Sequence, residues 1–302
     1  MIMLQMSGGL GNQMFTYALY KALQKEGKTV CIEDFTHYGD IGRRDSCLEK
    51  IFPLNYGRGE REEYIRLTDS SMLPWIRLRR KVFGRKDKVY KEKDAIVFEP
   101  GIFSEEDCYA EGYWQSARYF EKVQDELRRD FTFAWDKFPE KAKEYKTQME
   151  QTNSVSLHVR RGDYLSDKFA HIYGGICTEA YYEGAKAYLQ KKYPDCVFYL
   201  FTNDPEWGRS QTGDNLVFVD CTGPDNAYVD MALMGCCKHH IIANSSFSWW
   251  GAWLNPNQDK TVIAPAKWLN TSGGQDIYCG LCNVKVDAEG RVTEENKEGR
   301  LT

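Results

Sequence analysis

The sequence predicts an α/β protein with two domains built on parallel sheets, and three observations support this fold class. The chain has 302 residues, which is long for a single domain. It begins with a strand, a glycine turn, a helix and a second strand. Its second half alternates short apolar strands with amphipathic helices, which is typical of parallel sheets covered by helices. We place the domain boundary near residue 150, giving domains 1–150 and 151–302.

The start of the N-terminal domain has the clearest pattern. Its expected elements are a strand at 2–6, a glycine turn at 7–11, a helix at about 12–26 and a strand at 29–33. The helix shows the spacing of one buried face in Met14, Phe15, Ala18, Leu19, Ala22 and Leu23. Gly27 follows as a C-cap. Residues 40–115 are less regular, and a helix around 117–130 leads to a charged segment at 136–151 that contains the boundary.

The C-terminal domain is predicted in more detail. Its expected strands are 155–159, 196–202, 216–219, 240–243 and 261–264, and its expected helices are 179–193, 227–237 and 247–254. Trp249, Trp250 and Trp253 are expected in the core or at a domain interface rather than as sugar platforms. The charged, glycine-containing tail from about residue 287 is expected to fray.

A basic stretch interrupts the N-terminal domain. Residues 72–76 are mostly apolar and 77–93 are basic, with Arg77, Arg79, Arg80, Lys81, Arg85, Lys86, Lys88, Lys91 and Lys93 against Asp87 and Glu92. One interpretation is a solvated insertion. The alternative is contact of residues 72–93 with an anionic membrane surface or a polyanionic glycan.

Composition narrows the class of protein. Hydrophobic residues make up 42% and charged residues 28%, as in globular proteins, and a net charge of −4 gives no general basic field for nucleic acid. No basic leader and no run of about 18 apolar residues is present, so we expect a cytoplasmic protein, with peripheral contact at the inner membrane face as the alternative for 72–93. The ten cysteines are expected as reduced, packed thiols. Cys279 and Cys282 lack the second pair that a structural zinc site needs.

The segment after the strand 155–159 carries the most informative residues. It reads His158-Val-Arg-Arg-Gly-Asp-Tyr164, which brings Arg160, Arg161 and Asp163 to the carboxyl end of a strand. Open α/β sheets bind ligands at that edge, and a guanidinium can hold a phosphate with two parallel hydrogen bonds. The segment therefore predicts a diphosphate clamp.

Two other strand ends of the same domain carry polar groups. Thr202-Asn203-Asp204 follows one strand, and Asn244-Ser245-Ser246-Phe247 follows another and opens a helix. These ends would converge on one crevice. The first turn of a helix attracts anions, so Ser245 and Ser246 favour a phosphate, although Ser246 also fits a plain N-cap.

The N-terminal glycine turn, Gly8-Gly-Leu-Gly-Asn-Gln13, lacks the third glycine of a dinucleotide fingerprint, since Met14 stands there. Asn12 and Gln13 could add amide hydrogen bonds to a ligand; the alternative is a tight turn alone. His158 is either a structural histidine or a contact to ribose or base. His171, His239 and His240 form no ligand cluster, and no acidic pair suited to a sugar-nucleotide metal is present, so phosphate handling without a metal is expected.

Three blocks of the sequence resemble the bacterial α-1,2-fucosyltransferases. They are the segments Gly8–Phe15, His158–Tyr164 and Asn244–Leu254, in the order of that family. The resemblance implies a GT-B fold, with two Rossmann-like domains whose parallel sheets face a central cleft, and an inverting transfer of L-fucose from GDP-β-L-fucose to O2 of a terminal galactose. It also implies that no divalent metal is required, and that the acceptor is an oligosaccharide or a polysaccharide repeat unit.

The same resemblance assigns expected roles to single residues. The N-terminal domain would lie on the acceptor side and the C-terminal domain would bind GDP-fucose. Arg160 would hold the β-phosphate, Ser245, Ser246 and Phe247 would flank the diphosphate, and His158 would lie near the nucleoside. Asn12 would face the donor, and Asp230 is a candidate for the guanine edge.

The general base and the function itself retain alternatives. Asp163 is either the base that takes the acceptor proton or a partner that orients Arg160 or Arg161, and a pH–rate profile of Asp163→Asn separates the two. The alternative functions are a non-catalytic nucleotide- or glycan-binding protein of the same fold, a fucosyltransferase of another linkage, and, less favoured by the glycine turn, a nicotinamide oxidoreductase. The natural acceptor and the oligomeric state are not given by the sequence.

Overall fold

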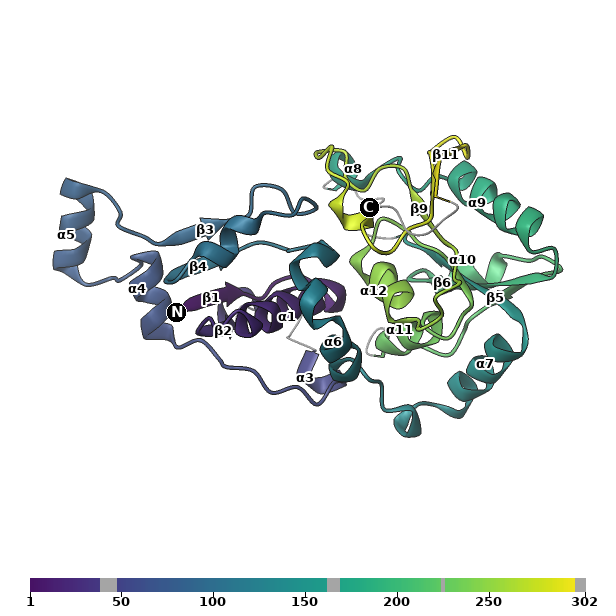
Figure 1. The fold of residues 1–302 in the computed structure, drawn as a ribbon, viewed down its shortest axis with the longest axis horizontal. Coiled ribbons are helices and arrows are strands. Elements are labelled where there is room, and N and C mark those ends of the chain that lie inside the picture. Colours follow the sequence, from purple (N-terminus) through teal and green to yellow (C-terminus); the bar gives the residue numbers. More distant parts are fainter. Residues whose placement is uncertain (39–47, 162–168, 224–225, 297–302) are drawn as a thin grey trace. The chain divides into compact units, whose positions relative to one another are not determined.

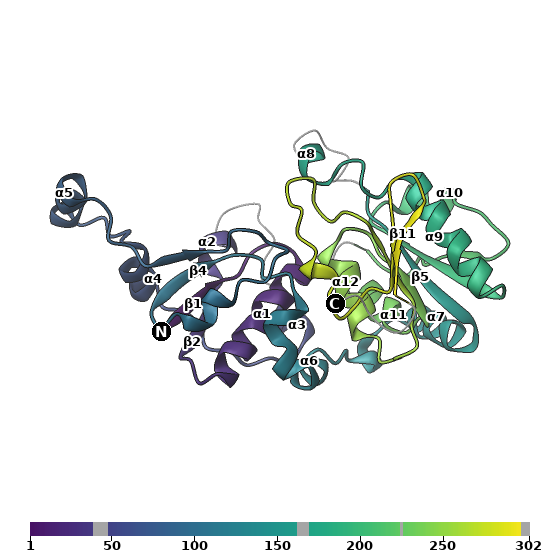
Figure 2. The same cartoon turned by 45° about the horizontal axis from the view of Figure 1, so that its top comes forward.

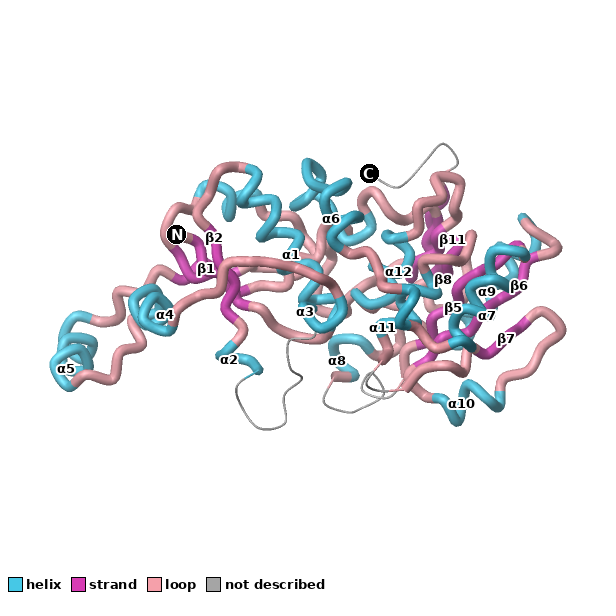
Figure 3. Tube along the Cα trace, turned by 90° about the horizontal axis from the view of Figure 1, so that it is seen from below, coloured by secondary structure: helices cyan, strands magenta, loops and turns pink. Residues whose placement is uncertain are grey.

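The computed structural model describes residues 1–38, 48–161, 169–223 and 226–296 (Figure 1). The chain divides into two compact units, Met1–Thr132 and Phe133–Thr302. Both units are α/β, and both are built on parallel strands, magenta in Figure 3. The predicted fold class is confirmed in these respects.

The first unit has a parallel sheet of order β2-β1-β4-β3. Its strands are β1 (Ile2–Gln5), β2 (Val30–Glu33), β3 (Val89–Lys91) and β4 (Cys108–Glu111). Its helices are α1 (Leu10–Lys25), α2 (Phe35–Tyr38), α3 (Leu48–Ile51), α4 (Arg61–Thr68), α5 (Pro74–Phe83), η1 (Pro100–Ser104), η2 (Ala117–Val123) and α6 (Gln124–Asp130). The strands β3 and β4 lie in the region that showed little regular patterning.

Helix α1 is the buried helix of the first unit. Every apolar residue of its predicted face is buried, and so are Gln13, Thr16, Tyr17 and Tyr20. The helix begins at Leu10 rather than at Asn12, because the carbonyl of Gly9 already accepts hydrogen bonds from the backbone N–H groups of Asn12 and Gln13, at 2.9 and 3.1 Å. Gly27 follows it with φ +78°, as predicted for the end of a helix.

Helix α5 lies outside the core of the first unit. It buries none of its ten residues. Figure 2 shows it standing away from the sheet, at the end of the unit beyond α4.

The second unit has a seven-stranded sheet of order β11-β10-β9-β8-β5-β6-β7. Its strands are β5 (Asn153–Val159), β6 (Cys196–Thr202), β7 (Leu216–Phe218), β8 (His239–Ile241), β9 (Val262–Pro265), β10 (Val284–Val286) and β11 (Val292–Glu295). Its helices are η3 (Trp135–Lys137), α7 (Glu140–Gln151), α8 (Ala170–Tyr173), α9 (Glu179–Lys192), α10 (Pro205–Ser210), α11 (Tyr228–Met234), α12 (Ser246–Leu254) and η5 (Asp276–Tyr278).

Alternation along β5 decides which side chains face which helix layer. Val155, Leu157 and Val159 pack into a core with α9, whereas Tyr199 and Phe201 of β6 point to the other face and pack with α7 and α11. Figure 1 shows α9 and α7 on opposite sides of these strands. His158 therefore shares the face of α7 and α11, since it alternates with Leu157 and Val159.

The domain boundary lies earlier than the predicted position near residue 150. Helix α7 belongs to the second unit, because Phe138, Ala142 and Met149 pack against Tyr199 and Phe201 of its sheet. The charged residues of this segment form the outer face of α7. Their charge is the reason why the sequence placed the domain boundary within this segment.

The prediction that the tail frays from about residue 287 is wrong for the part that the structure describes. Strand β11 pairs antiparallel with β10, and Asp287 closes the turn between them by accepting backbone N–H bonds from Glu289 and Arg291, at 3.0 and 2.8 Å. Residues 297–302 lie outside the described residues. Among the described helices, none combines the length and the apolarity needed to cross a bilayer.

Candidate functional site

The carboxyl edge of the second sheet has the topology of a ligand site. Strand β5 pairs with β6 on one side and with β8 on the other, so the chain proceeds outward from β5 in one direction and later returns to its opposite side. Open α/β sheets bind ligands at the carboxyl ends of two such strands. The predicted residues Arg160 and Arg161 directly follow β5, and Asn244, Ser245 and Ser246 follow β8.

Arg161 is held by the end of the neighbouring strand β6. Its backbone N–H donates to Asn203 Oδ1 at 2.8 Å, and its Nε donates to Asp204 Oδ2 at 3.1 Å. Its guanidinium carbon lies 4.7 Å from the centroid of the Trp207 ring. Asp204 also caps α10, because its other carboxylate oxygen accepts the N–H of Trp207 at 3.0 Å. In this structure Asn203 and Asp204 thus position the arginine segment.

Arg160, the residue between the strand and Arg161, is half-buried. Because Arg161 is tied down on both its backbone and its side chain, the segment that carries Arg160 has a defined course at the end of β5. The structure therefore brings together four of the predicted site residues: Arg160, Arg161, Asn203 and Asp204. Asp163 lies outside the described residues.

His158 is buried on β5, with a side-chain Nδ1 that has no hydrogen-bond partner in the structure. Burial, assisted by the charge of Arg160, lowers the pKa of this histidine to about 3, so its ring is neutral at physiological pH. Its ring centroid lies 5.9 Å from that of Phe247, the second residue of α12. By contrast, the buried His240 bonds Ser156 at 2.7 Å and Asn255 at 2.8 Å and is structural.

Helix α12 begins at the edge where β8 ends. Its N-cap is Ser245, not Ser246 as proposed from the sequence, and the Ser245 side chain makes no capping hydrogen bond. The backbone of Ser245 accepts instead from Trp249 N–H, at 3.0 Å. Trp249, Trp250 and Trp253 are buried, which confirms that they are core residues. The ring contact between Phe247 and His158 places the N-terminal end of this helix, which carries the positive end of the helix dipole, beside β5.

Asp230 lies in the first turn of α11, which follows the loop after β7. Its carboxylate accepts a hydrogen bond from Thr222 Oγ1 at 2.9 Å. Burial raises the pKa of Asp230 to about 7 despite this bond. A carboxylate with little solvent and one protein partner keeps acceptor capacity for a ligand N–H group.

The carboxyl edge of the first sheet contains Asn12 and Gln13. Strand β1 pairs with β2 on one side and with β4 on the other. Asn12 Oδ1 accepts from Gln115 Nε2, after β4, at 2.9 Å. Gly8 has φ +75°, and a Cβ atom there would stand 2.4 Å from Asn12 Nδ2. The buried Gln13 donates to the carbonyl of Gly8 at 3.2 Å and so holds the glycine turn from within.

Sequence reasoning missed the residues that shape the loop after β4. The carboxylate of Glu92 accepts the backbone N–H of Tyr113 at 2.6 Å and that of Trp114 at 3.1 Å. Burial raises the pKa of Glu92 to about 7, although these bonds oppose the shift. The Tyr113 side chain is 43% exposed beside Gln115. The sequence signal was the aromatic pair Tyr113-Trp114 after Gly112, of which Trp114 is buried and Tyr113 is exposed.

No group of three or more histidine, cysteine, aspartate or glutamate residues in the described ranges is arranged to hold a metal ion. Within the described ranges the cysteines, Cys279 and Cys282 included, form no disulfide bond.

The chain matches the model of glycosyl transferase family 11 over residues 90–278. It is 32% identical over 277 residues to an alpha-1,2-colitosyltransferase of Escherichia coli, an alignment that covers 89% of this chain and 92% of the relative.

Two further similarities are more distant. Galactoside alpha-(1,2)-fucosyltransferase 1 of Ateles belzebuth is 26% identical over 259 residues, which covers 82% of this chain and 63% of that protein. The solved structure of the fucosyltransferase NodZ from Bradyrhizobium aligns with a TM-score of 0.44 at 13% identity, over 88% of this chain and 96% of that one.

Proposed function

Because the chain belongs to glycosyl transferase family 11, and is therefore a glycosyltransferase, we propose that it transfers L-fucose from GDP-β-L-fucose to O2 of a terminal galactose, with inversion at the anomeric carbon. The observation that carries this proposal is the cationic segment Arg160–Arg161 at the edge between β5 and β8, close to the N-terminus of α12. Such an edge suits a diphosphate.

The donor is proposed to bind the second unit. Arg160 would hold the β-phosphate, and Ser245, Ser246 and Phe247 would flank the diphosphate at the helix N-terminus. The unpartnered Nδ1 of His158 has a hydrogen bond to offer the nucleoside. The carboxylate of Asp230 would accept N–H groups of the guanine edge. Asn203 and Asp204 would act through Arg161, which they position.

The reaction breaks the bond between fucose C1 and the diphosphate oxygen and forms a bond between C1 and the acceptor O2. The bonding pair leaves with GDP, so negative charge grows on the diphosphate while the sugar becomes cation-like. A prearranged guanidinium stabilises that charge more in the transition state than in the ground state. The O2 proton is proposed to pass to Asp163, with the orientation of Arg160 or Arg161 as the alternative role of that residue.

The acceptor is proposed to contact the first unit. Asn12 and Gln115 offer neutral amide groups, which suit the hydroxyl groups of a sugar. The exposed ring of Tyr113 offers an apolar face to the C–H side of a galactose ring. Asn12 remains a proposed donor contact as well.

One experiment tests the proposal and its nearest alternative together. Colitose is fucose without the hydroxyl at C3, so the purified chain is given GDP-fucose or GDP-colitose with an array of galactose-terminated acceptors, and GDP release and product linkage are measured. We expect GDP release with GDP-fucose, an α-1,2 linkage in the product, and unchanged turnover with a chelator present. Faster turnover of GDP-colitose would change the donor. A different linkage would change the acceptor position, and loss of turnover in the chelator would contradict metal independence.

A further inference from the structure

The strongest unassigned feature of the molecule is the surface of helix α5. Six of the eight large apolar side chains that are exposed among the described residues lie in or beside this helix: Met72, Leu73, Trp75, Leu78, Val82 and Phe83, exposed by 48 to 73%. Folded domains rarely leave so many apolar side chains together in water. A helix of ten residues is also only marginally stable without packing.

The exposed residues of the helix form an apolar stripe and a basic stripe that lie side by side. Trp75, Leu78 and Val82 are spaced three and four residues apart, which aligns them along one side. Arg77 and Lys81 are four residues apart and form the neighbouring stripe, whereas Arg79 pairs with Asp69. The sequence around the helix, 72–93, has nine basic and two acidic residues, whereas the whole chain has 40 basic and 44 acidic. The positive charge is therefore local.

Several of these basic residues hold the helix in place and are not available to a partner. Arg79 pairs with Asp69, and Arg80 donates to the carbonyls of Asp69 and Ser71. The backbone N–H of Lys86 also donates to Asp69, at 3.0 Å. This hydrogen bond and the Arg79 guanidinium hold the pKa of Asp69 below its usual range. One aspartate thus fixes both ends of the α5 loop.

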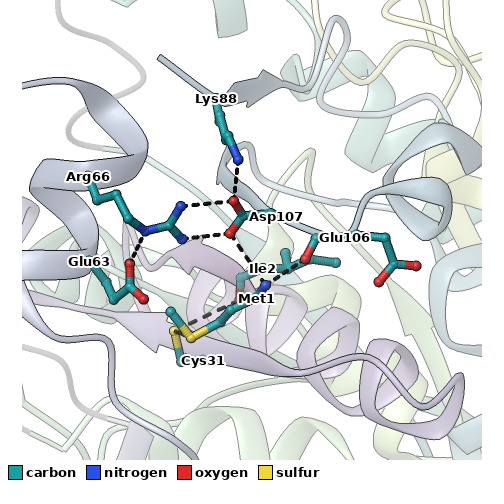
Figure 4. A network of polar contacts seen from close by, with 8 residues as sticks. All are labelled: Met1, Ile2, Cys31, Glu63, Arg66, Lys88, Glu106 and Asp107. Atoms are coloured by element: carbon teal, nitrogen blue, oxygen red, sulfur yellow. Dashed lines mark hydrogen bonds and ion pairs between the residues drawn. The ribbon is translucent and has the colours of Figure 1, made fainter. Parts of the chain in front are cut away.

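A second cluster anchors the base of this region to the sheet. Figure 4 shows Asp107, just before β4, between Arg66 of α4 and Lys88, with the amino group of Met1 beside it. Arg66 donates twice, at 2.6 and 2.9 Å, and together with Lys88 holds the pKa of Asp107 well below its usual range. Arg77, Lys81 and Arg85 make no ion pair to the residues that the structure describes.

We propose that α5 binds an anionic lipid surface, with Trp75, Leu78 and Val82 in the boundary between headgroups and acyl chains and with Arg77, Lys81 and Arg85 on lipid phosphates. An amphipathic helix with a basic polar face binds such a surface by both kinds of contact. A second copy of the chain is disfavoured, because a two-fold contact would bring equal positive charges together. A soluble polyanion would leave the apolar face in water. The inference is independent of the proposed function.

The test measures binding of the full chain to vesicles of phosphatidylcholine with or without phosphatidylglycerol, by co-sedimentation at low and high salt. We expect binding to the anionic vesicles alone, weakened by salt. Trp75 is 61% exposed, so its fluorescence should be quenched by brominated lipids, and Trp75→Phe should remove that quenching.

Two pairs of variants separate the charge contribution from the apolar one. Arg77→Gln, Lys81→Gln and Arg85→Gln combined should weaken binding about a hundredfold, since each cation near the surface contributes about a factor of five. The control is Lys137→Gln, Lys141→Gln and Lys191→Gln on the second unit. Val82→Ser should weaken binding about tenfold. Its control is Val292→Ser, which changes another exposed valine, 43% exposed on β11.

All these positions are exposed, so the variants should fold and keep transfer to a soluble acceptor. The proposal is overturned if the wild-type chain does not bind anionic vesicles at low salt, or if both triple variants weaken binding equally. It is also overturned if vesicle binding is absent throughout while the α5 variants abolish self-association or heparin binding. Loss of self-association would assign the surface to a second copy of the chain, and loss of heparin binding would assign it to a polyanion.

Discussion

The carboxyl edges of the two sheets share a topology but differ in charge. In each unit the first strand, β1 or β5, has a parallel neighbour on both sides, and a helix begins at the carboxyl edge that these strands share. In the second unit this edge carries Arg160 and Arg161. In the first unit the corresponding groups include the neutral amides of Asn12 and Gln115 and the exposed ring of Tyr113, while the carboxyl group of Glu33 at the end of β2 is buried and accepts from Thr36 and Tyr109.

This difference indicates how one fold can serve two kinds of ligand. Arginines and a helix N-terminus favour a diphosphate, which carries charge. Amides and an aromatic ring favour a neutral sugar, whose hydroxyl groups and C–H face need hydrogen bonds and apolar contact. Under the proposed function, the topology would position a ligand at each edge, and the side chains would decide its class.

The largest expected effect tests the charged edge. Arg160→Lys retains the positive charge but loses the two-pronged hydrogen bonding, so we expect the turnover number to fall by about 10²–10³. Steady-state kinetics with GDP-fucose and a galactoside measure the effect. The matched control is Arg209→Lys, which alters an exposed arginine paired with Asp220 and should leave turnover within about twofold. Equal turnover of wild type and Arg160→Lys would remove Arg160 from its proposed role.

A smaller effect is expected at the neutral edge. Tyr113→Ala removes the exposed ring, and we expect the KM for the acceptor to rise about tenfold while the KM for GDP-fucose stays unchanged. Tyr113→Phe keeps the ring and should behave like the wild type. If Tyr113→Ala changes the donor KM instead, the two edges do not divide the ligands as proposed.

The smallest effect concerns stability against pH, since each edge contains one carboxyl group with a pKa raised to about 7: Glu92 in the first unit and Asp230 in the second. Between about pH 4 and pH 7 the folded chain binds more protons than the unfolded chain at these groups. Their contribution to stability is therefore complete below about pH 4 and is lost as the pH rises through 7.

Denaturant unfolding of wild type, Asp230→Asn and Glu92→Gln between pH 5 and 7.5 measures this effect. Each substitution should reduce the fall in unfolding free energy with pH, by at most about 1.4 kcal/mol per pH unit. A slope that both substitutions leave as in the wild type would show that neither carboxyl group titrates in this range.

Much of the second unit could be predicted because its signals are local. An apolar strand followed by Arg160 and Arg161, or a helix opened by the serine pair 245–246, is visible in a few consecutive residues. Strands β3 and β4 were not predicted, since β3 is short, half-exposed and basic, and β4 follows acidic residues. Glu92 and Tyr113 were missed because the bond between them joins segments whose register no local pattern reveals.

Helices α5 and α12 show what composition can and cannot predict about burial. Both contain tryptophan and apolar residues, yet α12 buries Trp249, Trp250 and Trp253 while α5 buries nothing. The arginines and lysines around α5 exclude it from a core, because burying an unpaired charge is costly. Composition thus separates the two helices, but it does not show what α5 contacts.

The sequence by itself determined the α/β class, five of the strands of the second unit (β5 to β9) and the polar residues at the carboxyl ends of three of them. Only the tertiary structure decided which of those groups meet, such as Arg161 with Asp204 and Asn12 with Gln115. It also decided that Arg79 and Arg80 are bound internally while Arg77 and Lys81 are not. The physical reason is that periodicity reports the face of one element, whereas a hydrogen bond or ion pair depends on where a distant segment returns.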